Sequence, residues 1–395
     1  MTDKKSIRMD ILRKLLSPGA VLTRPELVKL YDIRPATLFA IIDEIKDEGI
    51  IIEPERKTLK TGRKASPLKL NPDFGCFIGV ELHTAYSTAT LINSEGSPLA
   101  SASVQTKGTK DDKKCFAEIT QVLEKLKADS APQLWTNIKS AGFADPGLVN
   151  TQEGISVKAV NINNWANLRT REWFKENFGL DTLTIPANSA RTYMEYKQFP
   201  EPPGSIFHIE LDQGIGAGFI KNGKLFSGDS FCGMEIGHIS IMPDGPLCQC
   251  GNRGCLEAVV GEEGIKKKIA EFKASRVETK LDPENFSFEE FIKCVNENDK
   301  AASLIAYDIS DKIGRALVPA AALLNPSVII MSGRLTGLEK ILLTTVKRIL
   351  TLNCMPRAVN KLVVKISGLG RNAAASGAAL LARDQFLLGD DLRIC

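Results

Sequence analysis

His238 and the cysteines Cys248, Cys250 and Cys255 lie within a span of eighteen residues. One imidazole and three thiolates form a closed tetrahedral ligand set, the composition of structural rather than catalytic zinc sites. Two glycines between the last two cysteines let the backbone turn tightly enough to bring both thiolates to one ion. The sequence therefore predicts a structural Zn²⁺ site with these four residues as ligands.

The length and cysteine content limit the class of protein. The 395 residues are enough for two or three domains, each with its own hydrophobic core. Nine cysteines, six of them scattered, and a polar N-terminal segment favour a reducing cytoplasm over secretion or a disulfide framework. No apolar run approaches the length of a membrane span, so we expect no membrane partner.

The net charge is unevenly distributed along the chain. Residues 1–70 contain fifteen Lys and Arg against ten Asp and Glu, a balance of +5, whereas the whole chain carries +4. A basic N-terminal segment is expected if that segment contacts a polyanion such as DNA. Solvated surface charge would give the same count, so charge alone does not decide between the two interpretations.

The first seventy residues predict three helices and two short strands. Apolar residues at helical spacing, separated by turn residues, place the helices at residues 4–16, 24–30 and 35–46. The strands at 50–52 and 68–70 flank a basic loop. Helix, helix, short turn, helix and hairpin are the order of a winged helix-turn-helix, and we assign residues 1–71 to such a DNA-binding domain.

Asn71-Pro72 marks a boundary, and two stretches of related pattern follow it. Each begins with alternating strands and tight turns, the first from Cys76 and the second from Ser205. Helices and further strands come after each opening, including strands at 327–331 and 362–366. We therefore expect residues 72–395 to form two α/β lobes of related plan, about 72–187 and about 188–395.

Several motifs in a fixed order resemble those of one family. They are Pro146-Gly147, Asn161-Ile-Asn-Asn-Trp165, Gly214-Ile-Gly-Ala-Gly218, Glu-x-Gly-His at 235–238, Cys-x-Cys-Gly-x-x-Gly-Cys-Leu-Glu at 248–257 and Asn325-Pro-Ser-Val-Ile-Ile-Met-Ser-Gly333. On these motifs the chain resembles ROK-family transcriptional regulators (repressor, open reading frame, kinase) over residues 5–395. The resemblance implies an actin-like, RNase H-like sugar-kinase fold after the winged helix, with a sugar bound beside the zinc.

The resemblance also implies a set of sugar-binding residues. Carried over by motif position, they are Asn161, Asn188, Glu235, His238 and Glu257. Carboxylates and amides suit a polyol because they form hydrogen bonds with its hydroxyl groups. His238 would serve both sites, with one ring nitrogen on the zinc and the other facing the sugar.

Kinases of the family need a carboxylate that accepts the proton of the sugar hydroxyl. An Asn-Asp pair supplies it there, whereas this chain has Asn188-Ser189. Both phosphate-binding loops differ too, because Glu81-Leu-His-Thr-Ala85 replaces Asp-x-Gly-Gly-Thr and Asp212-Gln-Gly214 replaces Gly-Thr-Gly. We therefore expect no catalytic residue, no kinase activity and no ATP as cofactor.

Six residues are the candidate DNA contacts. Arg34 and Thr37 lie near the start of the third predicted helix, off its apolar stripe, where side chains reach bases or phosphates. Asp43 and Glu44 lie further along that helix and would face away from DNA or clash with it. The basic loop resembles the wing of family repressors, in which an arginine enters the minor groove, and it contributes Lys57, Lys60, Arg63 and Lys64.

The favoured hypothesis is a cytoplasmic, sugar-responsive transcriptional regulator that represses carbohydrate-use genes. It would bind a double-stranded DNA operator as a homodimer or homotetramer and change its arrangement when a sugar or sugar phosphate binds. Two alternatives stay open. One is an active ATP-dependent sugar kinase with an appended DNA-binding domain, and the other is a regulator that answers to a phosphosugar or a protein partner.

Overall fold

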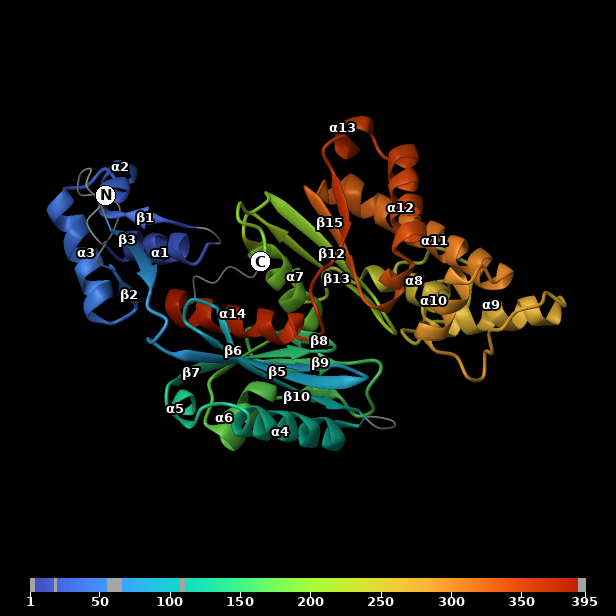
Figure 1. Cartoon of the computed structure of the whole chain (residues 1–395), viewed down its shortest axis with the longest axis horizontal. Coiled ribbons are helices and arrows are strands. Elements are labelled where there is room, and N and C mark those ends of the chain that lie inside the picture. The colour runs from blue at the N-terminus through green and yellow to red at the C-terminus, as the bar shows by residue number, and fades with distance from the viewer. Residues whose placement is uncertain (1–3, 18–19, 55–65, 107–110, 390–395) are drawn as a thin grey trace. The chain divides into compact units, whose positions relative to one another are not determined.

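The computed structural model describes residues 4–17, 20–54, 66–106 and 111–389 (Figure 1). Contacts divide the chain into two compact units, with boundaries between Pro202 and Pro203 and between Leu369 and Gly370. Unit one contains the N-terminal half together with the last helix, and unit two contains the segment between the boundaries. No helix within the described ranges combines the length and the apolar character needed to span a membrane.

The N-terminal part of unit one contains three helices and a small antiparallel sheet of order β1-β3-β2. Its elements are α1 (Lys4–Leu15), β1 (Leu22–Thr23), α2 (Arg24–Leu30), α3 (Pro35–Asp47), β2 (Ile51–Ile52) and β3 (Pro67–Leu70). A capping box starts α2, in which Thr23 accepts a hydrogen bond from the backbone of Glu26 and the Glu26 carboxylate accepts one from Thr23. Leucine and isoleucine side chains from the three helices form the core. This arrangement is consistent with the predicted winged helix-turn-helix.

The larger sheet of unit one has the order β11-β7-β4-β5-β6. Its strands are β4 (Cys76–Leu82), β5 (Tyr86–Asn93), β6 (Pro98–Gln105), β7 (Ile138–Asp145) and β11 (Thr182–Pro186). A small sheet contains β8 (Leu148–Asn150), β9 (Ile155–Lys158) and β10 (Ala166–Leu168). The helices are α4 (Asp112–Ala128), α5 (Pro132–Trp135), α6 (Thr170–Phe178), α7 (Ala187–Lys197) and α14 (Ala373–Leu388). Figure 1 shows α4 and α6 on one face of the larger sheet and α14 on the other.

Glycines let α14 lie unusually close to its neighbours. A Cβ atom at Gly79 on β4 would be 1.7 Å from a carbonyl oxygen of α14, and one at Gly142 on β7 would be 2.1 Å from another. Gly377 on α14 meets α7 in the same way, because its Cβ would be 1.9 Å from the carbonyl oxygen of Ala190. Helix α14 therefore packs backbone to backbone against both the sheet and α7.

Unit two repeats the strand plan of unit one. Its sheet order is β14-β13-β12-β15-β16, in which β12, β13 and β14 are antiparallel and β15 and β16 run parallel to β12. The strands are β12 (Ser205–Leu211), β13 (Ile215–Lys221), β14 (Lys224–Leu225), β15 (Val328–Ser332) and β16 (Val363–Ile366). The helices are η1 (Ile236–His238), α8 (Leu256–Val260), α9 (Glu262–Ala274), α10 (Phe288–Asn296), α11 (Lys300–Leu324), η2 (Arg334–Leu338), α12 (Glu339–Asn353) and α13 (Pro356–Val359). The prediction of two α/β parts with related plans is confirmed.

The predicted elements agree closely with the observed ones. The three predicted N-terminal helices coincide with α1, α2 and α3, whose ends differ by at most one residue from the prediction, whereas β1 was not predicted. The division into units differs from the predicted lobe boundary near residues 187 and 188, because α7 and α14 both pack in unit one. The assignment of residues 1–71 and 72–395 to separate domains stays a prediction.

Replacing Gly377 by Ala should destabilise the protein although alanine is the better helix former. The helix propensity favours alanine by about 1 kcal/mol. The new Cβ, 1.9 Å from the carbonyl oxygen of Ala190, forces α7 and α14 apart, and overpacking typically costs about 1–3 kcal/mol. We expect a lower midpoint in thermal unfolding followed by circular dichroism. Gly204→Ala is the control, because its Cβ would be an ordinary 3.6 Å from Ser327 Oγ. Equal midpoints for both variants would contradict the close contact.

Candidate metal centre and effector site

The four predicted metal ligands converge in unit two. His238 ends η1, Cys248 and Cys250 lie in the loop that follows, and Cys255 directly precedes α8. Their ligand atoms all lie within 4.8 Å of one another. The Sγ atoms of Cys250 and Cys255 are 3.6 Å apart, and Sγ of Cys248 lies 3.6 Å from Nδ1 of His238. The cluster can therefore hold a metal ion.

The separations fit a tetrahedral zinc ion. With Zn–S bonds of about 2.3 Å, two sulfur ligands at the corners of a tetrahedron lie about 3.8 Å apart. The observed sulfur separation of 3.6 Å is close to this value. Three thiolates and one imidazole also disfavour magnesium and calcium, which prefer oxygen ligands.

Two glycines shape the metal loop. Gly251 and Gly254 have φ angles of +93° and +67°, a left-handed region that side chains rarely adopt. A Cβ on Gly254 would in addition lie 1.5 Å from the carbonyl oxygen of Met242. The tight turn predicted from these glycines is confirmed, and it brings the cysteines on either side of it together.

One predicted sugar-binding residue, His238, belongs to the metal cluster, and two others, Glu235 and Glu257, lie close to its members in the sequence. Nδ1 of His238 faces Cys248, while its Nε2 lies 3.9 Å from a carboxylate oxygen of Glu235. Partial burial raises the pKa of Glu235, the nearby His238 opposes this effect, and the charge of Glu257 adds to it. Glu257 accepts a hydrogen bond of 2.7 Å from the backbone of Ile215. One nitrogen of His238 therefore faces the metal cluster and the other faces a carboxylate.

In unit two, Asp212 and Arg334 form an ion pair where the second phosphate loop was expected. The Asp212 carboxylate accepts hydrogen bonds from the backbone of Gln213 at 2.7 Å and of Arg334 at 3.1 Å. It also accepts two from the Arg334 guanidinium, at 2.5 and 2.9 Å. The guanidinium lies 4.4 Å from the centre of the Phe288 ring, a further attractive contact. The Asp212 carboxylate thus accepts hydrogen bonds from two backbone N–H groups and one guanidinium that could otherwise bind an anion.

The remaining sugar candidates lie in unit one. Asn188 is the second residue of α7, directly after β11, and Ser189 follows it. The side-chain oxygen of Asn188 is buried and has no hydrogen-bond partner among the residues that the structure describes. Leaving such an acceptor unpaired costs about 1–3 kcal/mol. Asn161 is exposed in the loop before β10. The single sugar site that would join these residues to Glu235, His238 and Glu257 stays a prediction.

A buried ion pair stands at the end of β4, where the first phosphate loop was expected. Glu81 accepts a hydrogen bond of 3.0 Å from Arg191, and their side chains are 1% and 6% exposed. Arg191 lies on α7, two residues after Ser189. Past the strand, the rings of His83 and Tyr86 stack with centres 4.3 Å apart. The carboxylate at position 81 is therefore neutralised by the helix that carries Ser189.

Asp145 is a residue of this region that the sequence analysis missed. It ends β7, and its buried carboxylate accepts hydrogen bonds from the backbone of Gly147 at 2.8 Å and from the indole of Trp165 at 3.1 Å. Burial raises its pKa to about 6, and these hydrogen bonds oppose that shift. Because Trp165 ends the motif that begins at Asn161, Asp145 anchors the loop of a sugar candidate. In the sequence, Asp145 could have been recognised as an acidic residue between an apolar strand and a Pro-Gly turn.

The candidate DNA contacts are described only in part. Arg34 is the exposed N-cap residue of α3 and makes no capping hydrogen bond, and Thr37 is half-buried on the first turn. The remaining candidates lie outside the described residues, and they are Lys57, Lys60, Arg63 and Lys64. The DNA contacts therefore stay a prediction.

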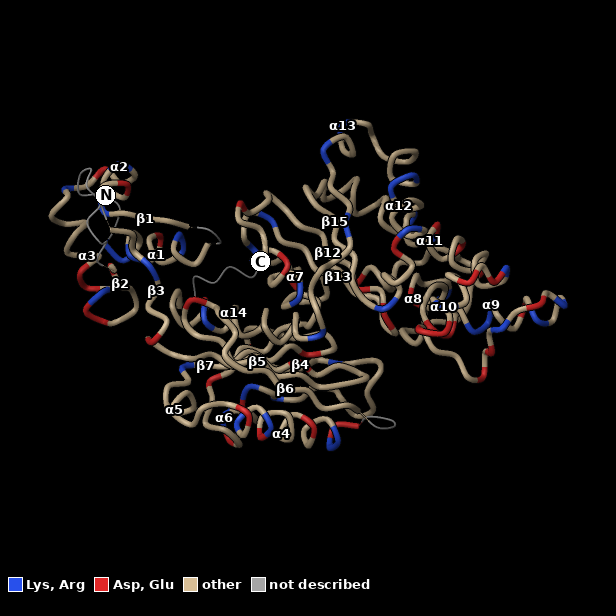
Figure 2. Tube along the Cα trace, in the orientation of Figure 1, with Lys and Arg blue, Asp and Glu red and all other residues tan. Residues whose placement is uncertain are grey.

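Arg24 forms ion pairs with two acidic residues, Asp43 of α3 and Glu53. Figure 2 shows acidic residues toward the end of this helix. The guanidinium of Arg24 lies 2.6 Å from Asp43 and 3.0 Å from Glu53, and it covers the Phe39 ring at 5.3 Å. The hydrogen bond from Arg24 is the main reason that the pKa of Asp43 is lowered. Asp43, which the sequence analysis expected to face away from DNA or clash with it, is thus paired with a cation of the same part of the protein.

Comparisons with known proteins agree with the fold. The sequence model of the ROK family matches residues 77–385 of this chain. The xylose repressor of Caldicellulosiruptor bescii is 24% identical over 389 residues, which cover 97% of each chain. A solved ROK family transcriptional regulator, a homolog of the E. coli MLC protein, has a TM-score of 0.81 and 25% identity and covers 98% of this chain and 97% of its own. The glucokinase of Thermotoga maritima is 27% identical over 319 residues, which cover 78% of this chain and 97% of the kinase.

We expect the purified protein to contain about one zinc ion per chain and Cys250→Ala to lose it. Cys250 is exposed, so its replacement removes a ligand with little loss of packing. Because a structural zinc ion stabilises only the folded form, the variant should also unfold at a lower temperature. Elemental analysis and thermal unfolding measure both effects. Cys232→Ala, which removes an exposed thiol outside the cluster, should change neither. Wild-type metal content in Cys250→Ala would show that the cluster is not the metal site.

Proposed function

The chain belongs to the ROK family, and from this membership we propose that it is a sugar-responsive, DNA-binding transcriptional regulator. Its similarity to a xylose repressor along 97% of the chain supports this role. The three N-terminal helices precede the region that the family model matches, as an added DNA-binding domain would. We infer that the protein represses carbohydrate-use genes in the cytoplasm and binds its operator as a homodimer or homotetramer.

The observation that carries the effector proposal is the buried, unpaired side-chain oxygen of Asn188. A sugar hydroxyl is a small donor that would satisfy this acceptor. Residue types that bind polyols also lie in the metal cluster and close to its members in the sequence, and the proposed effector contacts are Asn161, Asn188, Glu235, His238 and Glu257. Zn²⁺ would hold the loop between His238 and Cys255 so that Glu257 stays in place at the start of α8.

We propose further that the sugar is sensed and not phosphorylated. Ser189 has no carboxylate with which to accept a proton. The carboxylates at positions 81 and 212, in the two expected phosphate loops, are paired with arginines, Glu81 with Arg191 and Asp212 with Arg334. A metal–nucleotide complex would have to displace both pairs. The alternative of an active sugar kinase is favoured by one finding, the similarity to a glucokinase over 78% of the chain.

A sugar effector should raise the thermal unfolding temperature, because it binds the folded form alone. We expect this from a screen of pentoses, hexoses, amino sugars and their phosphates. Asn188→Ala should weaken the affinity of the stabilising sugar about tenfold, equivalent to about 1.4 kcal/mol. Asn177→Ala, at an exposed asparagine of α6 whose amide bonds only the backbone of Trp173, is the control. No stabilisation by any sugar would contradict the effector proposal.

Operator binding is tested with the same preparation. DNA selected from a random duplex library should bind tightly, and the stabilising sugar should change the dissociation constant by about 5-fold to 150-fold. Failure to select any sequence would contradict a role in transcription.

Kinase activity is tested with ATP, magnesium and the stabilising sugar. We expect neither ADP nor sugar phosphate above a no-protein control. Ser189→Asp alone should stay inactive, since the Glu81–Arg191 and Asp212–Arg334 pairs remain in that variant. Turnover by the wild-type protein would establish the kinase alternative instead.

A further inference from the structure

Helix α7 carries two polar residues of different kinds at its ends. Asn188, the proposed sugar contact, lies at the start, and Lys197 is the last residue. They are nine positions apart in the sequence, a distance of about 14 Å along the helix. Gly377 brings α14 into backbone contact with α7 at Ala190, so the two helices pack closely along this stretch. A displacement at Asn188 would therefore reach Lys197.

Lys197 belongs to a buried charge cluster at the far end of this pair. Asp384 on α14 accepts hydrogen bonds from Tyr193 and Arg383, and its carboxylate lies 3.1 Å from the Lys197 ammonium. Arg383 and Asp384 are 3% and 2% exposed, and Lys197 is 12% exposed. Burial lowers the pKa of Lys197, and the attraction of Asp384 opposes that shift. Two cations thus share one carboxylate.

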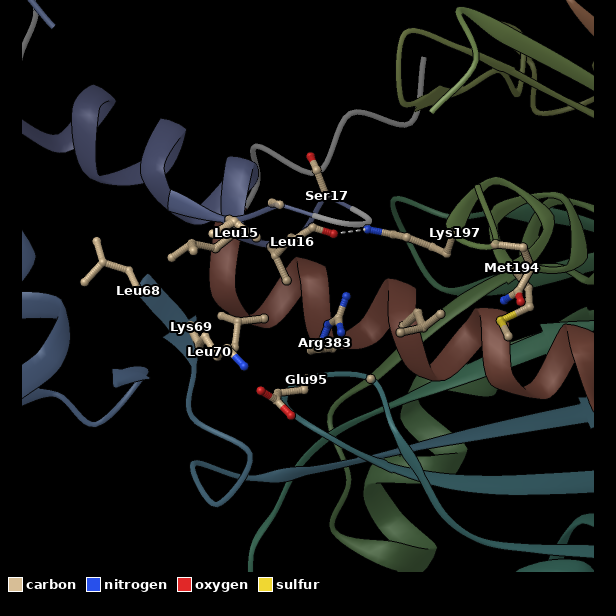
Figure 3. Close-up of a pocket in the computed structure, with 15 residues that line it drawn as sticks. Leu15, Leu16, Ser17, Leu68, Lys69, Leu70, Glu95, Met194, Lys197 and Arg383 are labelled. Carbon is tan, nitrogen blue, oxygen red and sulfur yellow. Dashed lines mark hydrogen bonds between the residues drawn. The ribbon is translucent and has the colours of Figure 1, made fainter. Parts of the chain in front are cut away.

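The second partner of Lys197 comes from the N-terminal part of the chain. Its ammonium donates a hydrogen bond of 2.6 Å to the carbonyl oxygen of Leu16 (Figure 3). Leu16 directly follows α1, so this carbonyl lies at the negative end of the helix dipole, where a cation is favoured. Within the α7–α14 pair Lys197 contacts Asp384 and the Tyr193 ring, which is 4.9 Å away, whereas the Leu16 carbonyl is its contact with the N-terminal part.

An apolar contact joins the same two parts. Leu387 and Leu388 at the end of α14 lie in the hydrophobic core that α1, α2 and α3 form. Beside the Lys197–Leu16 bond, however, the packing is open. A cavity of about 460 Å³ is lined by Leu16, Lys69, Glu95, Met194 and Lys197, among others (Figure 3). Among the described residues, the side chains beside this bond are therefore less tightly packed than those of the core.

We propose that Lys197 is a positioning residue that couples the effector site to DNA binding. Its hydrogen bond to Leu16 sets the orientation of the N-terminal helices on the α7–α14 pair, so a sugar that shifts α7 at Asn188 changes operator affinity. The coupling rests on the proposed function, whereas the bond itself does not.

The variant Lys197→Met tests the bond and the coupling separately. It keeps an unbranched side chain only one atom shorter and leaves Asp384 paired with Arg383 and Tyr193, so we expect the protein to fold. Lys125→Met is the matched control, because Lys125 also donates to a backbone carbonyl in unit one, that of Ser103 at 3.2 Å, but far from α1 in the sequence. Lys197→Arg keeps a cationic donor and should restore what Lys197→Met loses.

Hydrogen exchange measures the bond without sugar or DNA. We expect amides of the last turn of α1 to exchange faster in Lys197→Met than in the wild type, and at the wild-type rate in Lys125→Met. Unchanged exchange in Lys197→Met would overturn the proposal at its first step, whether or not the protein binds an operator.

Operator titration with and without the stabilising sugar measures the coupling. In Lys197→Met the ratio of the two dissociation constants should fall to within about twofold of one, against the larger ratio typical of coupled sites. It should stay at the wild-type value in Lys125→Met and return toward it in Lys197→Arg. A wild-type ratio in Lys197→Met would overturn the coupling. A wild-type protein that binds no operator would instead overturn the proposed function.

Discussion

The packing of α14 is the constraint on which unit one depends. Glycines on β4 and β7 place the helix backbone directly on the sheet, and Gly377 of the helix places it directly on α7; any larger residue at these three positions would collide. The same helix contacts α7 and ends in the N-terminal core through Leu387 and Leu388. Unit one is therefore completed by the last segment of the chain, after all of unit two. Contacts over such a sequence distance form late and slowly in folding, because a long loop must close first.

The charge pattern of the two units follows one rule. At Glu81 and Asp212 a buried or half-buried carboxylate is paired with an arginine from another segment, and the buried Asp384 is paired with its neighbour Arg383 on α14. Removing one partner from such a pair leaves an uncompensated charge and costs far more than the pair contributes. The first two pairs lie where the sequence analysis expected the phosphate loops, and they agree with the proposal that the sugar is sensed and not phosphorylated.

Local features were predictable and distant ones were not. The four candidate metal ligands lie within eighteen residues, so spacing and glycines were enough to group them, and apolar periodicity located α1, α2 and α3. Short β1 has no periodicity to detect, and the union of α14 with unit one depends on contacts across almost the whole sequence. The partners of Glu81 and Asp212 were out of reach for the same reason, because Arg191 and Arg334 are each 110 or more residues away. The sequence therefore identified the unusual carboxylates but not the arginines that neutralise them.

The unpaired oxygen of Asn188 has a consequence for ligand choice. With no ligand present, this oxygen is sealed from water and lacks a donor among the described side chains and backbone groups. A deoxy analogue that fills the same space without presenting a hydroxyl would leave that deficit uncorrected. The protein would therefore bind the deoxy analogue more weakly than the sugar, because the Asn188 oxygen stays without a hydrogen-bond donor. This difference in affinity would persist even if all other contacts were identical.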